Sequence, residues 1–107
     1  MSGQITSQKY KSTFIKRLEK SAPEIREKFG VKRIGIYGSF ARGEETKKSD
    51  VDVMVELGDG YSTLRNFVRL ADFLEELFKR KVDLITVEGI DKYIQTQVMA
   101  EVIWIEG

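Results

Sequence analysis

The sequence contains no cysteine and no histidine. The absence of cysteine excludes disulfide scaffolds, zinc fingers, iron–sulfur centres and thiol nucleophiles. The absence of histidine excludes Ser-His-Asp triads, histidine-bound metals and imidazole acid–base catalysis. Any chemistry that this chain performs must therefore use Asp, Glu, Lys, Arg, Ser or Tyr side chains, together with hard metal ions.

Long apolar runs and an excess of charge of one sign are also missing. No apolar stretch approaches the ~18 residues of a membrane-spanning helix, and residues 1–10 lack the apolar segment of a secretory signal. We therefore expect a cytoplasmic protein without a membrane partner. The 18 basic and 17 acidic residues give a net charge of +1. This balance argues against nucleic acid as the main partner, because binding to nucleic acid depends on concentrated positive charge.

The length of 107 residues is that of one domain. Hydrophobic residues make up 41% of the chain, which is enough to bury a core without disulfides or a structural metal. We therefore expect a single domain over residues 1–107.

Apolar residues at helical and at alternating spacing predict an ordered series of helices and strands. Helices are expected over residues 12–30 with a break at Pro23, over 63–80 and over 91–99, with a helical turn over 40–42, and strands over 31–37, 50–57, 82–87 and 102–105. Strands separated by helices favour a sheet with helices packed on it. The sequence predicts an α/β (α+β) fold, with helices on one face of a mixed sheet of about four strands.

Two acidic residues share one face of the strand that begins at Asp50. Asp50 and Asp52 alternate with Val51 and Val53, and side chains at i and i+2 point to the same face of a strand. Two carboxylates ~7 Å apart on one strand repel each other and gain nothing from packing. A divalent cation would relieve this repulsion, and Mg²⁺ prefers carboxylate, phosphate and water oxygens.

A third acid, Asp83, alternates with Val82 and Leu84 in a later strand. It can share the face of Asp50 and Asp52 if the two strands are neighbours. Three convergent acids can hold two metal ions of the kind used in nucleotidyl transfer. The alternative is a solvated edge strand that carries acids without a functional role.

A turn that contains glycine follows the first strand. Gly38 permits close approach of a phosphate to the backbone, and Ser39 begins a helical turn whose free N–H groups attract anions. An ordinary strand-to-helix turn with an N-cap is equally consistent with these two residues. The turn is not a P-loop, because the sequence has no G-x-x-x-x-G-K-[ST] motif.

Together these motifs closely resemble those of the DNA polymerase beta-like nucleotidyltransferase superfamily. The matching residues are Gly38-Ser39-x-x-Arg42-Gly43, Ser49-Asp50-x-Asp52-x-x-Val55 and Asp83, within a motif core of about residues 32–105. Within the superfamily the chain is similar to the minimal nucleotidyltransferases (MNT). The nucleotidyltransferase fold is therefore the fold that the resemblance implies.

The resemblance also implies a set of site residues. Catalytic and metal-binding roles are implied for Asp50, Asp52 and Asp83, and nucleotide binding is predicted for Gly38, Ser39, Arg42 and Ser49. Two Mg²⁺ ions and ATP as the substrate are implied, with the acid at Asp83 also helping to activate the acceptor hydroxyl. A structural salt bridge is an equally consistent role for Arg42.

The 107 residues leave no segment for the acceptor-binding domain of larger superfamily members. We therefore expect the acceptor to dock on an open face of the sheet or to be supplied by another protein. Minimal nucleotidyltransferases are often paired with a HEPN-type toxin, and as antitoxins they can transfer AMP from ATP to a tyrosine of that partner. The resemblance thus implies a hetero-oligomeric antitoxin. A non-catalytic antitoxin of the same fold is the alternative, and transfer to a small molecule is disfavoured by the missing domain.

Overall fold

A computed structural model describes residues 13–105 and places helices and strands in the predicted order. The elements are α2 (Thr13–Phe29), β1 (Val31–Tyr37), α3 (Ser39–Arg42), β2 (Val51–Leu57), α4 (Leu64–Phe78), β3 (Val82–Thr86), α5 (Lys92–Glu101) and β4 (Ile103–Trp104). The predicted first residue of the first helix, at position 12, lies outside the described residues. Elsewhere the predicted boundaries differ from the structure by at most two residues, apart from the break at Pro23.

The four strands form one mixed sheet in the order β3-β2-β1-β4. β1 pairs antiparallel with β2 and with β4, while β2 and β3 are parallel and are joined through α4. Val53 of β2 lies opposite Ile36 of β1 and Leu84 of β3, so the apolar positions of the three strands share one face. The mixed sheet and the fold class predicted from the sequence are confirmed.

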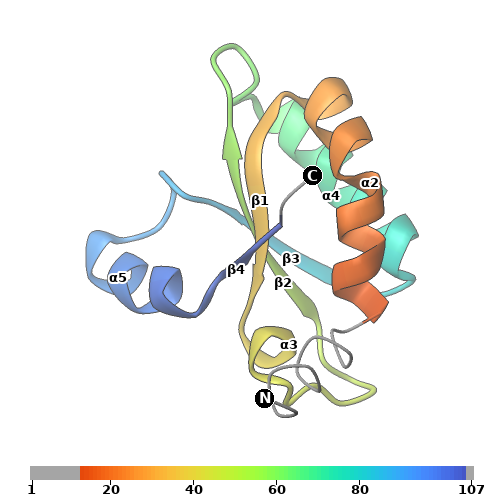
Figure 1. Ribbon diagram of the computed structural model, residues 1–107. Coiled ribbons are helices and arrows are strands. Elements are labelled where there is room, and N and C mark those ends of the chain that lie inside the picture. The colour runs from red at the N-terminus through yellow and green to blue at the C-terminus, as the bar shows by residue number, and fades with distance from the viewer. Residues whose placement is uncertain (1–12, 106–107) are drawn as a thin grey trace, which may run out of the picture.

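The helices α2 and α4 pack on the apolar face of the sheet (Figure 1). The largest fully buried side chains come from these two helices and from the strands β1 and β2: Leu18, Ile25, Ile34, Ile36, Val51, Val53, Met54, Val55, Leu70, Leu74 and Phe78. Their burial accounts for the helical and the alternating apolar patterns of the sequence. No helix among residues 13–105 combines the length and apolarity needed to span a bilayer.

Among residues 13–105, the short helix α5 lies on the opposite side of the sheet from α2 and α4 (Figure 1). None of the residues of α5 is buried, and Tyr93 and Ile94 are 81% and 51% exposed. This side of the sheet is accessible at the end that carries the acids, whereas Met54, on the same face of β2 as Asp52, is fully buried. Asp50 and Asp83 are exposed on this side of the molecule, and Asp52 is half-buried.

The expected break at Pro23 is wrong, because α2 continues through this residue from Thr13 to Phe29. Proline removes one intrahelical hydrogen bond and its ring clashes with the preceding turn. Here Pro23 is exposed, whereas Ala22 and Ile25 beside it are fully buried. Burial of these neighbours holds the helix together across the proline. The helix then ends before Gly30, whose φ of 65° favours glycine.

Replacing Pro23 tests how much stability the proline costs the helix α2. We expect Pro23→Ala to raise the free energy of unfolding by about 2 kcal/mol, because alanine restores the missing N–H, and the greater freedom of the unfolded chain offsets part of the gain. Urea unfolding followed by circular dichroism measures the difference. Lys16→Ala, at an exposed position of the same helix, is the control and should change stability by less than about 0.5 kcal/mol. A stability at or below wild type for Pro23→Ala would contradict this account.

Candidate active site

Two of the three predicted acids are direct neighbours in the sheet. Asp52 of β2 is in register with Asp83 of the parallel strand β3, and on its other side it is in register with Tyr37 of β1. One row across three strands therefore carries a hydroxyl and two carboxylates. The expectation that Asp83 shares a face with Asp52 is confirmed.

Asp50 joins this pair from outside the sheet. The strand β2 begins at Val51, so Asp50 is the last residue of the preceding loop rather than part of the ladder. The charge of Asp50, two residues away in sequence, still raises the pKa of the Asp52 carboxyl. The sequence thus predicted the proximity of Asp50 and Asp52 but not their different backbone settings.

The row of polar groups has unusual electrostatics. Burial raises the pKa of the Asp52 carboxyl above its ordinary value, and the charges of Asp83 and Asp50 raise it further, against an opposing effect of Arg42. Burial also raises the pKa of the Tyr37 hydroxyl, followed by the effects of Asp52 and Asp83. Tyr37 therefore remains protonated at neutral pH and is a hydrogen-bond donor beside two acceptors.

Burial and the neighbouring carboxylates make the ionised form of Asp52 destabilising to the folded chain at neutral pH. Because the folded-state pKa lies above the ordinary 3.8, proton uptake by Asp52 favours the folded chain. That contribution is full below the ordinary pKa and is lost as the pH rises through the folded-state pKa. We expect Asp52→Asn to melt at a higher temperature than wild type at neutral pH without metal, because the amide avoids both the burial of a charge and the repulsion.

Thermal melts in EDTA across the range from about pH 4 to pH 7 measure this difference. The gap between Asp52→Asn and wild type should widen as the pH rises. Asp59→Asn, at an exposed acid in the turn after β2, is the matched control and should not show the widening gap. A melting temperature of Asp52→Asn below that of wild type at neutral pH would show that the carboxylate stabilises the fold instead.

The turn between β1 and α3 requires glycine at its first position. Gly38 has φ 73° and ψ −147°, a combination open almost only to glycine, and it is the N-cap of α3. A Cβ at this position would collide with the Asp52 carboxylate. The turn and the acid are therefore packed against each other, which places the predicted phosphate turn beside the predicted metal ligands.

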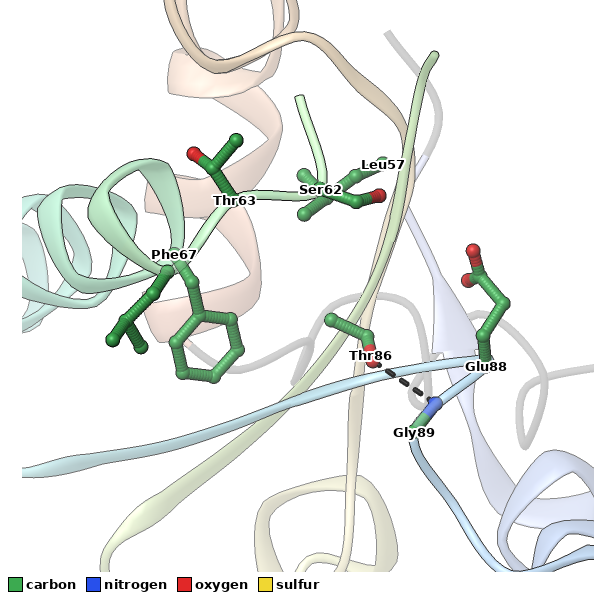
Figure 2. A pocket seen from close by; sticks show the side chains of 8 residues that line it. Leu57, Ser62, Thr63, Phe67, Thr86, Glu88 and Gly89 are labelled. Carbon is green, nitrogen blue, oxygen red and sulfur yellow. Dashed lines mark hydrogen bonds between the residues drawn. The ribbon is translucent and has the colours of Figure 1, made fainter. Parts of the chain in front are cut away.

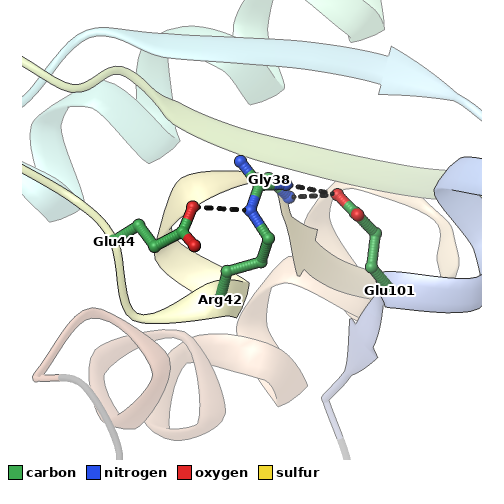
Figure 3. Close-up of polar contacts among 4 residues, drawn as sticks. All are labelled: Gly38, Arg42, Glu44 and Glu101. Carbon is green, nitrogen blue, oxygen red and sulfur yellow. Dashed lines mark hydrogen bonds and ion pairs between the residues drawn. The ribbon is translucent and has the colours of Figure 1, made fainter.

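A fourth carboxylate, from Glu101 at the end of α5, contacts this turn (Figure 3). Its Oε1 accepts a hydrogen bond from the Gly38 N–H at 3.1 Å and from Arg42 Nη1 at 3.0 Å. Arg42 Nε also donates to Glu44 Oε1 at 2.9 Å. Arg42 thus forms ion pairs with two carboxylates, which is the structural salt bridge that the sequence left open as its alternative role.

The two predicted serines have different surroundings. Ser39 is the first residue of α3, and its carbonyl accepts the N–H of Glu44. The Ser49 hydroxyl accepts the N–H of Thr46 at 2.8 Å and closes a turn in the loop before Asp50. Ser39 therefore lies in the turn at Gly38, whereas Ser49 makes contacts within its own loop.

Three residues of this region were missed by the sequence reasoning. Alternation along β1 places Tyr37 on the face of Asp52, a signal that was available but not used. Glu101 reaches Gly38 only through the packing of α5, for which the sequence has no local signal. Arg80 binds the loop before Asp50, and nothing in its sequence neighbourhood predicts this contact.

A shallow pocket of about 380 Å³ lies elsewhere, near the end of β2 and the start of α4 (Figure 2). It is lined by Leu57, Ser62, Thr63, Leu64, Phe67, Thr86, Glu88 and Gly89, none of which the sequence predicted as a site residue. Asp52 lies near the first residue of β2 and Leu57 is its last. The acids and the turn at Gly38 therefore form a separate site at the other end of the strand.

The donor set of the acids fits Mg²⁺ as an open site. Within residues 13–105 no three acidic side chains converge closely enough to form a ready-made metal cage. Mg²⁺, however, is usually held by one or two carboxylates together with water and substrate phosphates. Asp52 and Asp83 supply such a pair on adjacent strands, and the exposed Asp50 adjoins it. These residues fit the ion as an open, carboxylate-lined site.

Comparison with known proteins agrees with this geometry. The model of the nucleotidyltransferase domain family matches residues 18–105. The protein adenylyltransferase MntA of Thermococcus cleftensis is 39% identical over 82 residues, which are 77% of this chain and 82% of that protein. A provisionally named protein adenylyltransferase of Methanocaldococcus jannaschii is 36% identical over 90 residues, covering 82% of this chain and 90% of its own length.

Solved structures share the fold. A provisionally named minimal nucleotidyltransferase superposes with a TM-score of 0.74 at 30% identity, covering 83% of this chain and 90% of that one. The complex of a tri-AMPylated Shewanella oneidensis HEPN toxin with an MNT antitoxin gives a TM-score of 0.63 at 18% identity, covering 87% and 72%. At that identity the second likeness shows the fold alone. From the family match and the relatives, the chain belongs to the nucleotidyltransferase domain family and is a nucleotidyltransferase of the minimal (MNT) type.

Proposed function

We propose that this chain is a Mg²⁺-dependent protein adenylyltransferase that transfers AMP from ATP to a tyrosine of a HEPN-type partner and so acts as its antitoxin. The observation that carries the proposal is the pairing of Asp52 with Asp83 on an accessible sheet face, directly beside the turn at Gly38. Nucleotidyl transfer needs acidic ligands and a phosphate-binding turn within reach of each other. A cytoplasmic location, where ATP is abundant, fits this activity.

The turn at Gly38 is proposed to bind the triphosphate. Gly38 has no side chain to block the approach of a phosphate, and the N–H groups at the start of α3 point away from the helix. In this structure the Gly38 N–H and the Arg42 guanidinium both donate hydrogen bonds to the Glu101 carboxylate. A phosphate that uses these donors therefore takes the place of the Glu101 carboxylate, and Ser39 adds a hydroxyl to the same turn.

The acids are proposed to act at the α-phosphate. Asp50, Asp52 and Asp83 would hold Mg²⁺, which when bound polarises the phosphate oxygens and stabilises the charge that develops on them. The acceptor oxygen forms a bond to the α-phosphorus, and the bond to the β-phosphate oxygen breaks, so that pyrophosphate leaves. The exposed Asp83 carboxylate accepts the proton of the acceptor hydroxyl.

The acceptor is proposed to come from a partner protein. The face that carries Asp83 is accessible, and Tyr93 and Ile94 of α5 are exposed on the same side of the sheet. Correct positioning of an acceptor can supply ~7–11 kcal/mol of a transfer barrier, so slow turnover is expected without a docked acceptor. Solved structures of the same fold include an MntA–HepT toxin–antitoxin complex and a toxin–antitoxin with AMP-PNP, which support a partner and a nucleotide of this kind.

The activity is tested by the mass of the partner. We expect a co-purified HEPN partner to gain the mass of adenylyl groups when ATP and Mg²⁺ are added to the wild-type chain. Asp52→Asn and Asp83→Asn should each slow this gain by about 100-fold, because one removes a ligand and the other a proton acceptor. Intact-mass spectrometry over time measures the rates, with Asp59→Asn as the control. Near wild-type transfer by either variant would show that its assigned role is wrong.

The same experiment distinguishes the proposed enzyme from the alternative, a non-catalytic antitoxin of the same fold. It predicts that the wild-type chain neutralises the partner without any gain in mass. It also predicts that Asp52→Asn neutralises the partner as well as wild type does.

The phosphate turn is tested by matched glycine substitutions. Gly38 and Gly60 have φ values of 73° and 84°, but a Cβ collides with Asp52 only at Gly38, and nothing lies within 4 Å at Gly60. Alanine should cost about 1–2 kcal/mol of stability at Gly60 through backbone strain, and more at Gly38, where it also meets the Asp52 carboxylate. Gly38→Ala should in addition weaken ATP binding by about tenfold, roughly 1.4 kcal/mol, in isothermal titration calorimetry. Equal ATP affinity in the two variants would place the nucleotide elsewhere.

A further inference from the structure

We propose that Arg80 is a positioning residue that holds the loop before Asp50 against the phosphate turn, and thereby sets where the acidic ligands lie. The inference rests on the proposed function for its consequence in catalysis, whereas the contacts themselves belong to the fold. Arg80 lies between α4 and β3, two residues after Phe78 and three before Asp83.

The guanidinium of Arg80 binds the backbone of the loop. Its Nη1 donates to the carbonyl oxygen of Thr46 at 2.9 Å and to that of Ser49 at 2.6 Å. Ser49 directly precedes Asp50 in the chain. The loop residues from Gly43 to Lys48 are exposed, so few apolar contacts are available to fix them. A charged donor bound to two carbonyls supplies this anchor instead.

The same guanidinium also rests on the aromatic rings beside the phosphate turn. Its central carbon lies 5.4 Å from the ring centroid of Phe40 in α3 and 5.6 Å from that of Phe14 in α2. The two rings contact each other edge to face, with centroids 4.9 Å apart. Phe40 follows Gly38 and Ser39 in sequence, so Arg80 joins the loop of the acids to the element that begins at the phosphate turn.

The residue after Arg80 fixes the other side of Asp50. The backbone N–H of Val51 donates to the carbonyl of Lys81 at 2.9 Å. Asp50 therefore lies between two residues, Ser49 and Val51, that are both bound to the dipeptide Arg80–Lys81. Because this dipeptide leads directly into the strand of Asp83, one short segment sets the separation of Asp50 from Asp83.

Arginine suits this position and lysine does not replace it fully. The planar guanidinium can stack on aromatic rings while it donates in its plane, whereas an ammonium group is a compact charge on a flexible chain. Arg80→Met removes the donors and the charge but keeps much of the apolar stem. Arg80→Lys keeps the charge and loses the planar group, and it should give an intermediate effect.

Arg33→Met is the matched control. Arg33 is also half-buried, stacks on a ring, with its central carbon 4.1 Å from the centroid of Trp104, and donates to Glu56 Oε1 at 2.9 Å. It pairs with Glu56 near the far end of β1 from Tyr37, away from the acids. Loss of its contacts lowers stability without reaching the loop before Asp50.

The experiment measures two quantities on the full chain: amide hydrogen exchange of residues 43–53 and the Mg²⁺ concentration that half-saturates AMP transfer. We expect Arg80→Met to speed exchange in this segment and to raise the half-saturating Mg²⁺ concentration by about tenfold, as for other residues that orient metal ligands. Arg33→Met should leave both quantities within about twofold of wild type. Melting curves of both variants confirm that the chains are folded.

The outcomes separate the two proposals. Unchanged exchange of residues 43–53 in Arg80→Met, or an equal change in Arg33→Met, overturns the positioning role whether or not the chain transfers AMP. Faster exchange with an unchanged Mg²⁺ requirement overturns the link between Arg80 and the metal ligands. If the wild-type chain transfers no AMP, the proposed function fails, and the exchange comparison together with calorimetric titration of Mn²⁺ decides the role of Arg80.

Discussion

The parallel pairing of β2 with β3 is the constraint on which the rest of this structure depends. It aligns Val53 with Leu84 on the covered face, and it necessarily aligns Asp52 with Asp83 on the open one. A slip of one residue would turn an acid into the core, so the apolar positions hold the register that brings two like charges together. The fold thus holds the Asp52 and Asp83 carboxylates side by side, although like charges directly opposite each other destabilise a sheet.

Everything else in the site adapts to these charges. A side chain at position 38 would collide with the Asp52 carboxylate, so this position requires glycine. The Tyr37 hydroxyl keeps its proton because burial and the nearby carboxylates raise its pKa. Arg42, the cation of the turn, is bound by Glu44 and Glu101 rather than by the aspartates. Among the described residues, no short ion pair neutralises the negative charge of the aspartates. Uncompensated carboxylates close to one another favour the binding of a divalent cation.

The sequence predicted those parts of the molecule that depend on local periodicity. Alternation in β2 predicted the strand and the orientation of Asp52, and the position of Asp83 in a second alternating strand predicted that the two would meet. The continuity of α2 through Pro23 could not be predicted, because it depends on the burial of Ala22 and Ile25 by distant segments. The contacts of Glu101 and Arg80 were missed for the same reason, since each joins residues at least 31 positions apart.

The strand β4 has a consequence for spectroscopy. Trp104 is the only tryptophan of the chain, and its ring lies against the Arg33 guanidinium, with Gly35 opposite it in the sheet. Only two residues separate it from Glu101, whose carboxylate accepts hydrogen bonds from Gly38 and Arg42 at the turn before α3. A displacement of Glu101 that moves Val102 and Ile103 would change the environment of the indole. The intrinsic fluorescence of the unmodified protein is therefore an optical reporter placed next to the turn, free of background from a second indole.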